Sequence, residues 1–259
     1  MENIKYIKKE KYIPSDLKLM KSKFSFIDNI RKESFFRQTI KIHNKNIIFG
    51  IEGPIIFNNG KFWLNYAYVE NGKWGKHWIL VSPNLDKIIK RGECFIRLDS
   101  GCLSSLLGDN TCDCLAQLRT AEEILIERGG IIIHIPEQDG RGWKEYKMAN
   151  QRIMHETNLD TITVAREFYG GEDKIDIRTF DESALILKSL GFTMGYNFNI
   201  GTKNPKKVNA LLEAGFNVST QPIETNIPSK NLLKNLKAKD KFFHKQEKTH
   251  ARNKERQMV

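Results

Sequence analysis

Residues 114–136, CLAQLRTAEEILIERGGIIIHIP, decide the fold prediction. In residues 114–128 the apolar side chains recur at helical spacing, and Gly129-Gly130 is a typical helix stop. The apolar run over residues 131–136 is typical of a buried strand. A helix that passes directly into a buried strand favours an α/β layer structure in which part of the sheet is parallel.

The alternation of helix and strand continues beyond this segment. The sequence predicts helices over residues 144–156, 181–190 and 206–214 and a short strand over residues 196–200. Asp181 is the expected N-cap of the helix over residues 181–190. Before residue 97 the pattern changes, because short apolar runs are separated there by Asn59-Gly60 and Asn71-Gly72, which favour antiparallel hairpins.

We therefore predict an α/β fold, a mixed β-sheet flanked by helices with a β-rich N-terminal part. Residues 1–35 are expected to be an irregular basic arm. Residues 36–225 are expected to form the main domain, β-rich over residues 36–96 and α/β over residues 97–225. Residues 226–259 are expected to be a basic tail, partly helical or disordered.

The composition excludes several classes of protein. The chain has 259 residues, of which 40% are hydrophobic and 28% charged, as in an average globular protein rather than a fibrous or wholly disordered one. Its longest strongly apolar stretch, near residues 131–135, is too short to cross a bilayer. The N-terminal residues lack the apolar region of a secretory signal. We therefore expect a cytoplasmic protein whose four cysteines stay reduced, available for metal binding or catalysis.

Most of the net charge of +11 lies near the C-terminal end. Residues 230–259 hold ten Lys or Arg and three acidic residues, which leaves a mildly basic body. Such a body suits the binding of a small polyphosphate, whereas a loose basic tail attracts any polyanion without specificity. We expect no specific nucleic-acid role for the tail; a basic nucleic-acid-binding protein is the alternative.

Cys102, Cys112 and Cys114 form the most informative cluster. Three thiolates with no fourth Cys or His nearby describe an open zinc site that keeps one position for water. The alternative is that they are inert, buried cysteines. Cys94, in the strand-like run ECFIRL, is expected to belong to the core.

Two polar loops follow predicted strands. Asp139-Gly140-Arg141 comes after the strand over residues 131–136, where α/β folds place ligands; Asp139 suits a guanine-type edge and Arg141 a phosphate. The loop from Thr202 to Lys207 offers a hydroxyl, backbone amides and two ammonium groups to an anion. The alternative for both loops is an ordinary surface turn.

These residues together resemble the GTP cyclohydrolase II family, the zinc enzymes that begin riboflavin synthesis. The resemblance covers roughly residues 97–215. The matching positions are Arg97, Ser100, Cys102, Cys112, Cys114, Gln117, Asp139, Gly140, Arg141, Asp160, Thr161, Asp176, Arg178, Thr202 and Lys207.

The resemblance implies a hydrolase of cyclic amidine C–N bonds that attacks guanine C8 of GTP, or of a related purine nucleotide, and releases formate and pyrophosphate. It implies one Zn²⁺ per chain on the three cysteines, Mg²⁺ with the triphosphate, and a homodimer. It also implies that Asp176 is the base and that Arg178 acts at the α-phosphorus. Substrate binding is then implied for Arg97, Ser100, Gln117, Asp139, Gly140, Arg141, Thr161, Thr202 and Lys207.

The sequence departs from the family pattern at several positions. Nine residues rather than ten separate Cys102 from Cys112, and Asp99 and Gly101 replace a His and a Glu. The family has a catalytic tyrosine, associated with formamide hydrolysis, where this chain has Arg152. An arginine cannot serve as a phenol acid or base. We therefore predict a divergent member that retains the formyl group. The alternative is an inactive zinc protein that binds a guanine nucleotide as a sensor. A second alternative is that Tyr146, earlier on the same predicted helix, substitutes for the family tyrosine.

Overall fold

A computed structural model of the chain describes residues 5–11, 36–42, 45–70, 77–109, 111–143, 146–225 and 229–257. The strands are β1 (Lys5–Lys11), β2 (Phe36–Ile42), β3 (Lys45–Phe57), β4 (Phe62–Glu70), β5 (His77–Val81), β6 (Glu93–Asp99), β7 (Gly130–His134), β8 (Asn197–Ile200) and β9 (Asn217–Thr220). The helices are α2 (Leu85–Arg91), α3 (Leu103–Leu106), α4 (Cys114–Arg128), α5 (Lys147–Thr157), α6 (Thr161–Tyr169), α7 (Asp181–Ser189), α8 (Pro205–Glu213) and α9 (Lys230–Gln257), and a 3₁₀ segment covers Pro136–Gly142.

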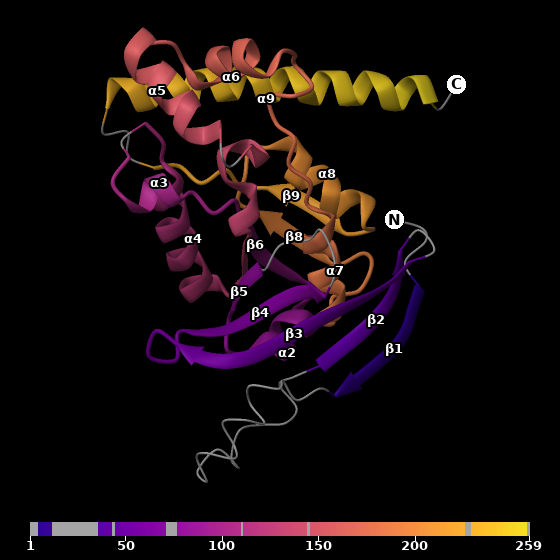
Figure 1. Cartoon of the computed structure of the whole chain (residues 1–259). Coiled ribbons are helices and arrows are strands. Elements are labelled where there is room, and N and C mark those ends of the chain that lie inside the picture. Colours follow the sequence, from indigo (N-terminus) through magenta and orange to yellow (C-terminus); the bar gives the residue numbers. More distant parts are fainter. Residues whose placement is uncertain are drawn as a thin grey trace.

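All these strands belong to one mixed sheet, in the order β1-β2-β3-β4-β5-β7-β6-β8-β9 (Figure 1). Neighbouring strands from β1 to β5 are antiparallel, and β5 pairs antiparallel with β7. From β7 through β6 and β8 to β9 the pairing is parallel. The predicted fold class, an α/β mixed sheet with a β-rich N-terminal part, is therefore confirmed.

The alternating side chains of β6 explain how the sheet is covered on both faces. Ile96 and Leu98 are fully buried in the core formed with α2, α7 and α8. Phe95 points to the other face and packs with Ala121 and Leu125 of α4. Cys94 belongs to the first of these cores, as predicted, and burial raises the pKa of its thiol to about 12.

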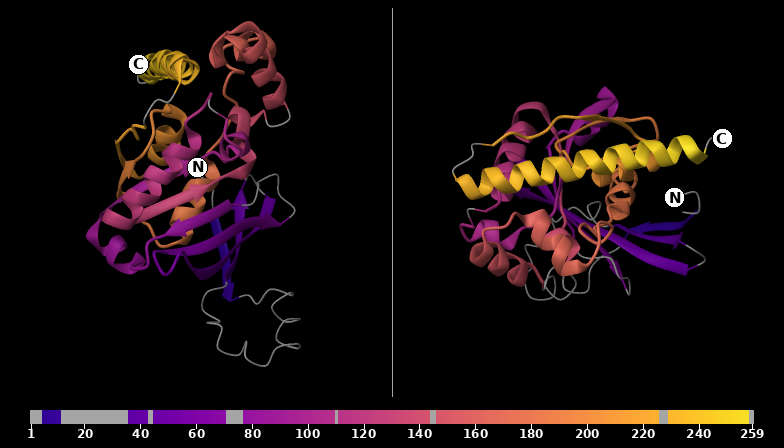
Figure 2. Two further views of the ribbon diagram at one scale, coloured as in Figure 1. Left: turned by 90° about the vertical axis from the view of Figure 1, so that its left-hand side faces the viewer. Right: turned by 90° about the horizontal axis from the view of Figure 1, so that it is seen from above.

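A third group of helices lies at one end of the sheet. Helices α5 and α6 form a separate layer there, and α9 runs across that end of the molecule (Figure 2). Phe242 of α9 is buried with Ile162, Ala165 and Ile175. The loops that follow the parallel strands are thus enclosed between the sheet and this helical layer.

The structure differs from the predictions at several elements. Residues 5–11, expected to be irregular, form β1, because pairing with β2 supplies backbone hydrogen bonds that the local sequence does not reveal. Of the two states predicted for the C-terminal residues, partly helical or disordered, the structure has the helical one, as the long helix α9. Phe180, not Asp181, occupies the N-cap position of α7, and the Asp181 carboxylate lies in its first turn. The turn at Asn58–Gly60 is present, whereas the predicted turn at Asn71-Gly72 lies outside the described residues. Within the described part of the chain, none of the helices has the length and apolar character needed to cross a bilayer.

Candidate active site

A cavity of about 500 Å³ lies between the ends of the parallel strands and the helical layer. The residues after β6 and β7, the start of α4 and the loop before α8 form its floor. Residues of α5, α6 and α9 form the opposite wall. Its volume is within the range of pockets that bind small molecules and cofactors.

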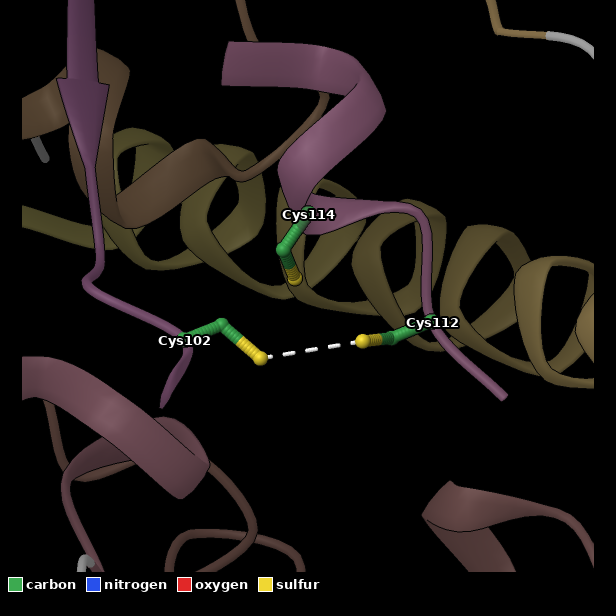
Figure 3. A group of neighbouring side chains, drawn as sticks. All are labelled: Cys102, Cys112 and Cys114. Carbon is green, nitrogen blue, oxygen red and sulfur yellow. Dashed lines mark hydrogen bonds between the residues drawn. The ribbon is translucent and has the colours of Figure 1, made fainter. Parts of the chain in front are cut away.

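The three predicted metal ligands meet in this cavity (Figure 3). Their sulfur atoms all lie within 4.8 Å of one another, and the Sγ atoms of Cys102 and Cys112 are 3.6 Å apart. Tetrahedral zinc with Zn–S bonds of about 2.3 Å places its sulfurs about 3.8 Å apart. The cysteine cluster, Cys102, Cys112 and Cys114, therefore fits a zinc ion, and it is the only group of this kind among the residues that the structure describes.

The thiols of the cysteine cluster are electrostatically unequal. The pKa of Cys102 is lowered because its sulfur accepts hydrogen bonds from Cys112, Cys114 and Lys147. The pKa of Cys114 is raised because its thiol donates to Cys102 and because it is buried. Cys102 is therefore the first thiolate, and metal binding has to displace protons from the other two sulfurs.

Asp109 closes the short loop between Cys102 and Cys112. Its carboxylate accepts hydrogen bonds from the Ser104 hydroxyl at 3.0 Å and from the backbone amide and hydroxyl of Thr111 at 2.8 and 2.7 Å. The side-chain amide of Gln151 also donates to it. This network holds the loop next to α5.

Lys147 links the cysteine cluster to the loop after β7. Its Nζ lies 3.0 Å from Sγ of Cys102 and 2.9 Å from Oδ1 of Asp139. The carboxylate of Asp139, expected to orient a ligand, is therefore already ion-paired. Gly140 has φ +58°, and a Cβ there would lie 3.1 Å from Cβ of Lys147, so the glycine permits this close approach.

Four buried or half-buried cations, here called the cationic cluster, line the other side of the cavity: Arg97, Arg141, Arg178 and Lys207. Lys207 is 4% exposed and donates to the Leu98 carbonyl at 2.6 Å; burial, together with the charges of Arg97 and Arg178, lowers its pKa. Arg141 bonds the hydroxyl of Thr161, and burial lowers its pKa to about 10.

The neighbouring carboxylates do not balance these cations. Asp99 lies 3.8 Å from Arg97 and Asp176 pairs with Arg178, which leaves an excess of positive charge. Buried charge without compensation is costly, so the side of the cavity that holds the cationic cluster favours an anionic ligand. Three buried polar atoms of cavity residues also have no hydrogen-bond partner within the described part of the chain: Arg97 Nε, Gln138 Oε1 and Asn150 Nδ2.

The structure brings most of the predicted site residues to the cavity. The residues that line it are Arg97, Ser100, Cys102, Cys112, Cys114, Gln117, Asp139, Gly140, Arg141, Thr161, Arg178, Thr202 and Lys207. Two predicted catalytic residues, Asp176 and Arg152, do not line it.

Asp176 lies behind Arg178 and has no exposed surface. Its oxygens accept from Nε and NH2 of Arg178 at 2.8 and 2.5 Å. Burial opposes its ionisation, but the charge and hydrogen bonds of Arg178 outweigh that effect and lower the pKa of Asp176 to about 2. This carboxylate is suited to orienting Arg178 rather than to accepting a proton near neutral pH.

Arg152 points to solvent. Its side chain is 80% exposed and pairs with Glu156 at 2.8 Å on the outer face of α5. The cavity instead receives Lys147, Asn150, Gln151 and Met154, which are one, or nearly one, helical turn apart. The helical period over residues 144–156 is the signal that would have identified Gln151 rather than Arg152.

Of the two tyrosines near α5, Tyr146 and Tyr169, one lines the cavity and the other does not. Tyr146 is 46% exposed and contacts the edge of Trp143, and it does not line the cavity. Tyr169, which the sequence did not single out, lines the cavity and stacks on Trp143 with ring centroids 4.4 Å apart. Burial raises its pKa.

The fold and the site define a class of protein: an α/β protein with a candidate three-cysteine metal centre beside a binding site for an anionic ligand. Comparison with known proteins narrows this class. A family model for GTP cyclohydrolase II matches residues 54–222, and the chain belongs to that family.

Individual relatives support this assignment. A GTP cyclohydrolase-2 of Helicobacter pylori strain Shi470 is 31% identical over 148 residues, which are 56% of this chain and 71% of the relative. The GTP cyclohydrolase-2 of Psychromonas ingrahamii is 34% identical over 134 residues, 50% of this chain and 64% of the relative. A riboflavin biosynthesis protein RibBA of Staphylococcus saprophyticus is 30% identical over 135 residues, 52% of this chain and 32% of the relative.

Proposed function

We propose that this protein is a zinc-dependent hydrolase that opens the imidazole ring of GTP at C8 and releases pyrophosphate. The observation that carries this proposal is that the cysteine cluster and the cationic cluster line one cavity. A nucleotide can then present its base to one cluster and its phosphates to the other. Membership of the GTP cyclohydrolase II family supports the choice of GTP.

The two clusters act on different parts of the nucleotide. Cys102, Cys112 and Cys114 would hold the zinc ion, which would supply Lewis acidity to a water directed at the purine carbon. Arg97, Arg141, Thr202 and Lys207 hold the triphosphate, which carries Mg²⁺, through charge-assisted hydrogen bonds.

Arg178 is the residue best placed to stabilise charge at the α-phosphate. It lines the cavity, and its guanidinium is fixed by Asp176 and by the Ser100 hydroxyl at 3.1 Å. A guanidinium held in this way is preorganised, so it loses little freedom when charge develops on the phosphate.

We further propose that the product retains its formyl group. Arg152, which stands where the family has its tyrosine, is exposed, and its neighbour Gln151, which does line the cavity, carries no titratable proton. Two waters are consumed, one to open the ring and one to release pyrophosphate, and the product is a formamidopyrimidine ribosyl monophosphate. Tyr169 is the one tyrosine among the described residues that line the cavity, so Tyr169→Phe is the variant that tests for residual formate release.

The test is to incubate pure, reduced, zinc-loaded protein with GTP and Mg²⁺, and to measure product mass, formate and pyrophosphate. Pyrophosphate with a formylated nucleotide supports the whole proposal. Stoichiometric formate contradicts formyl retention and leaves the ring-opening activity standing. Bound nucleotide without product favours the inactive sensor. Metal analysis should give one zinc per chain, lost in Cys112→Ser and kept in the control Cys94→Ala.

A homodimer, which the family resemblance implies, belongs to the same proposal. Its molar mass in solution, measured by light scattering on the full chain, tests it.

A further inference from the structure

Helix α9 lies beyond the residues that the family model matches, yet it forms part of the cavity wall. Both views of Figure 2 place it along the end of the molecule, next to the layer of α5 and α6. The sequence predicts a solvated basic tail, partly helical or disordered, over these residues. Because side chains of α9 line the cavity, they can contact a ligand bound there.

Asn235 connects α9 both to the loop that carries Cys112 and to the start of α6. This residue is 1% exposed. Its Oδ1 accepts from the backbone amide of Thr161 at 3.0 Å, and its Nδ2 donates to the carbonyl of Thr111 at 3.0 Å. Thr111 precedes the metal ligand Cys112, and Thr161 is the partner of Arg141. The register of α9 over the cavity is therefore fixed.

Lys239 is the notable side chain on the inner face of this helix. It is half-buried, lines the cavity, and lies close enough to Cys114 for its charge to favour the thiolate. Within the described part of the chain no hydrogen-bond or ion-pair partner of Lys239 is found. By contrast, Lys147 and Lys207 in the same cavity both have protein acceptors.

The position of Lys239 along α9 indicates which part of a nucleotide it meets. The next residue, Asp240, pairs with Lys203 at 3.2 Å, in the loop that begins with Thr202 and leads to Lys207. Lys239 therefore lies between the cysteine cluster and the phosphate-binding loop. A nucleotide that reaches from one to the other passes this ammonium group.

We propose that α9 is a wall of the nucleotide site and that Lys239 binds the phosphate chain of the substrate. This inference rests on the proposed function, because it takes the ligand to be a guanine nucleotide. It also divides the lysines of the C-terminal basic segment into two kinds. Lys239, which is half-buried, binds substrate; Lys237 also lines the cavity but is exposed, and the lysines on the outer face of α9 remain solvated.

The test compares Lys239→Met with the matched control Lys241→Met, whose lysine lies on the exposed face of the same helix. Binding of Mg²⁺-GTP and of guanosine to the full-length, zinc-loaded protein is measured by calorimetry. A charge-assisted hydrogen bond predicts that Lys239→Met weakens GTP binding about 10- to 100-fold. Guanosine binding should stay within about twofold, since guanosine lacks phosphates, and Lys241→Met should resemble wild type for both ligands.

Lys239→Arg keeps the charge and should retain most of the GTP affinity, which separates loss of charge from loss of fold. Equal GTP affinity of Lys239→Met and Lys241→Met overturns the inference. A parallel loss of guanosine affinity in Lys239→Met also overturns it. If the wild-type protein binds no GTP, the proposed function itself fails, and that result is distinguishable because it appears before any variant is made.

Discussion

The ammonium group of Lys147 lies 3.0 Å from the sulfur of Cys102, and it is also ion-paired with Asp139. This contact joins α5 to the metal loop. Three thiolates and one zinc carry a formal charge of −1, and a neighbouring cation offsets it. Partners outside the ligand set of a metal commonly change its affinity 10- to 100-fold.

Lys147→Met is therefore expected to weaken zinc binding about 10- to 100-fold. The methionine keeps much of the side-chain volume, so the loss reports the charge. Competition with a chromophoric chelator measures the affinity. The control is Lys87→Met, at an exposed lysine of α2. Unchanged zinc affinity in Lys147→Met would show that the contact with Cys102 does not support the metal.

Asp176 gives the protein an acid-sensitive contribution to stability. Its pKa is about 2 in the folded state and about 3.9 in an unfolded chain, so its ionised form favours folding. This contribution, of about 2 to 3 kcal/mol, is fully present above pH 4 and is lost as the pH falls through 4 towards 2.

Asp176→Asn is expected to lower the free energy of unfolding at pH 7 by about 3 to 5 kcal/mol, because it leaves Arg178 buried without its partner. Denaturant unfolding at pH 7 and at decreasing pH tests both statements. The difference between wild type and variant should shrink below pH 4. A constant difference across that range would contradict the assigned pKa.

Asn235→Ala removes both hydrogen bonds that fasten α9 to the site, leaving an amide and a carbonyl buried without partners. We expect a loss of about 2 to 4 kcal/mol in the free energy of unfolding. Asn231→Ala, at an exposed position of the same helix, is the control and should lie within about 0.5 kcal/mol of wild type. Urea unfolding measures both; equal stabilities would refute the anchoring role.

A tyrosine at a position of α5 that lines the cavity should allow the formyl group to be released as formate. Gln151→Tyr puts a tyrosine into the cavity and is expected to give measurable formate from GTP. Arg152→Tyr puts it on the exposed face of α5 and should leave the product as in wild type. Formate assays on both variants decide this. Formate from Arg152→Tyr alone would restore the position inferred from the sequence.

Sequence reasoning succeeds where the signal is local. Helix α4 begins and ends at the predicted residues, and the three cysteines meet because they flank one short loop. It fails for β1, because the partner strand lies about 30 residues away and the segment KYIKKEK has little apolar alternation.

The predictions for Arg152 and Asp176 differ from the structure because both depend on the three-dimensional surroundings of the residue. Counting along the chain from Arg141 selects Arg152, but the phase of α5 places the Arg152 side chain on the exposed face of that helix. The residue type of Asp176 suggests a base, although its burial behind Arg178 decides its chemistry. Neither the phase nor the burial is visible in a motif.

The sulfurs of Cys102 and Cys112 are 3.6 Å apart, so this pair is susceptible to oxidation when no metal is bound between them. Dioxygen from air can take two electrons and two protons from this pair, which joins the sulfurs at about 2.05 Å and releases hydrogen peroxide. The bridged form has lost two of its three ligands. Protein stored in air without a reductant is therefore expected to lose its capacity to bind zinc. Reduction with dithiothreitol before zinc is added should restore that capacity.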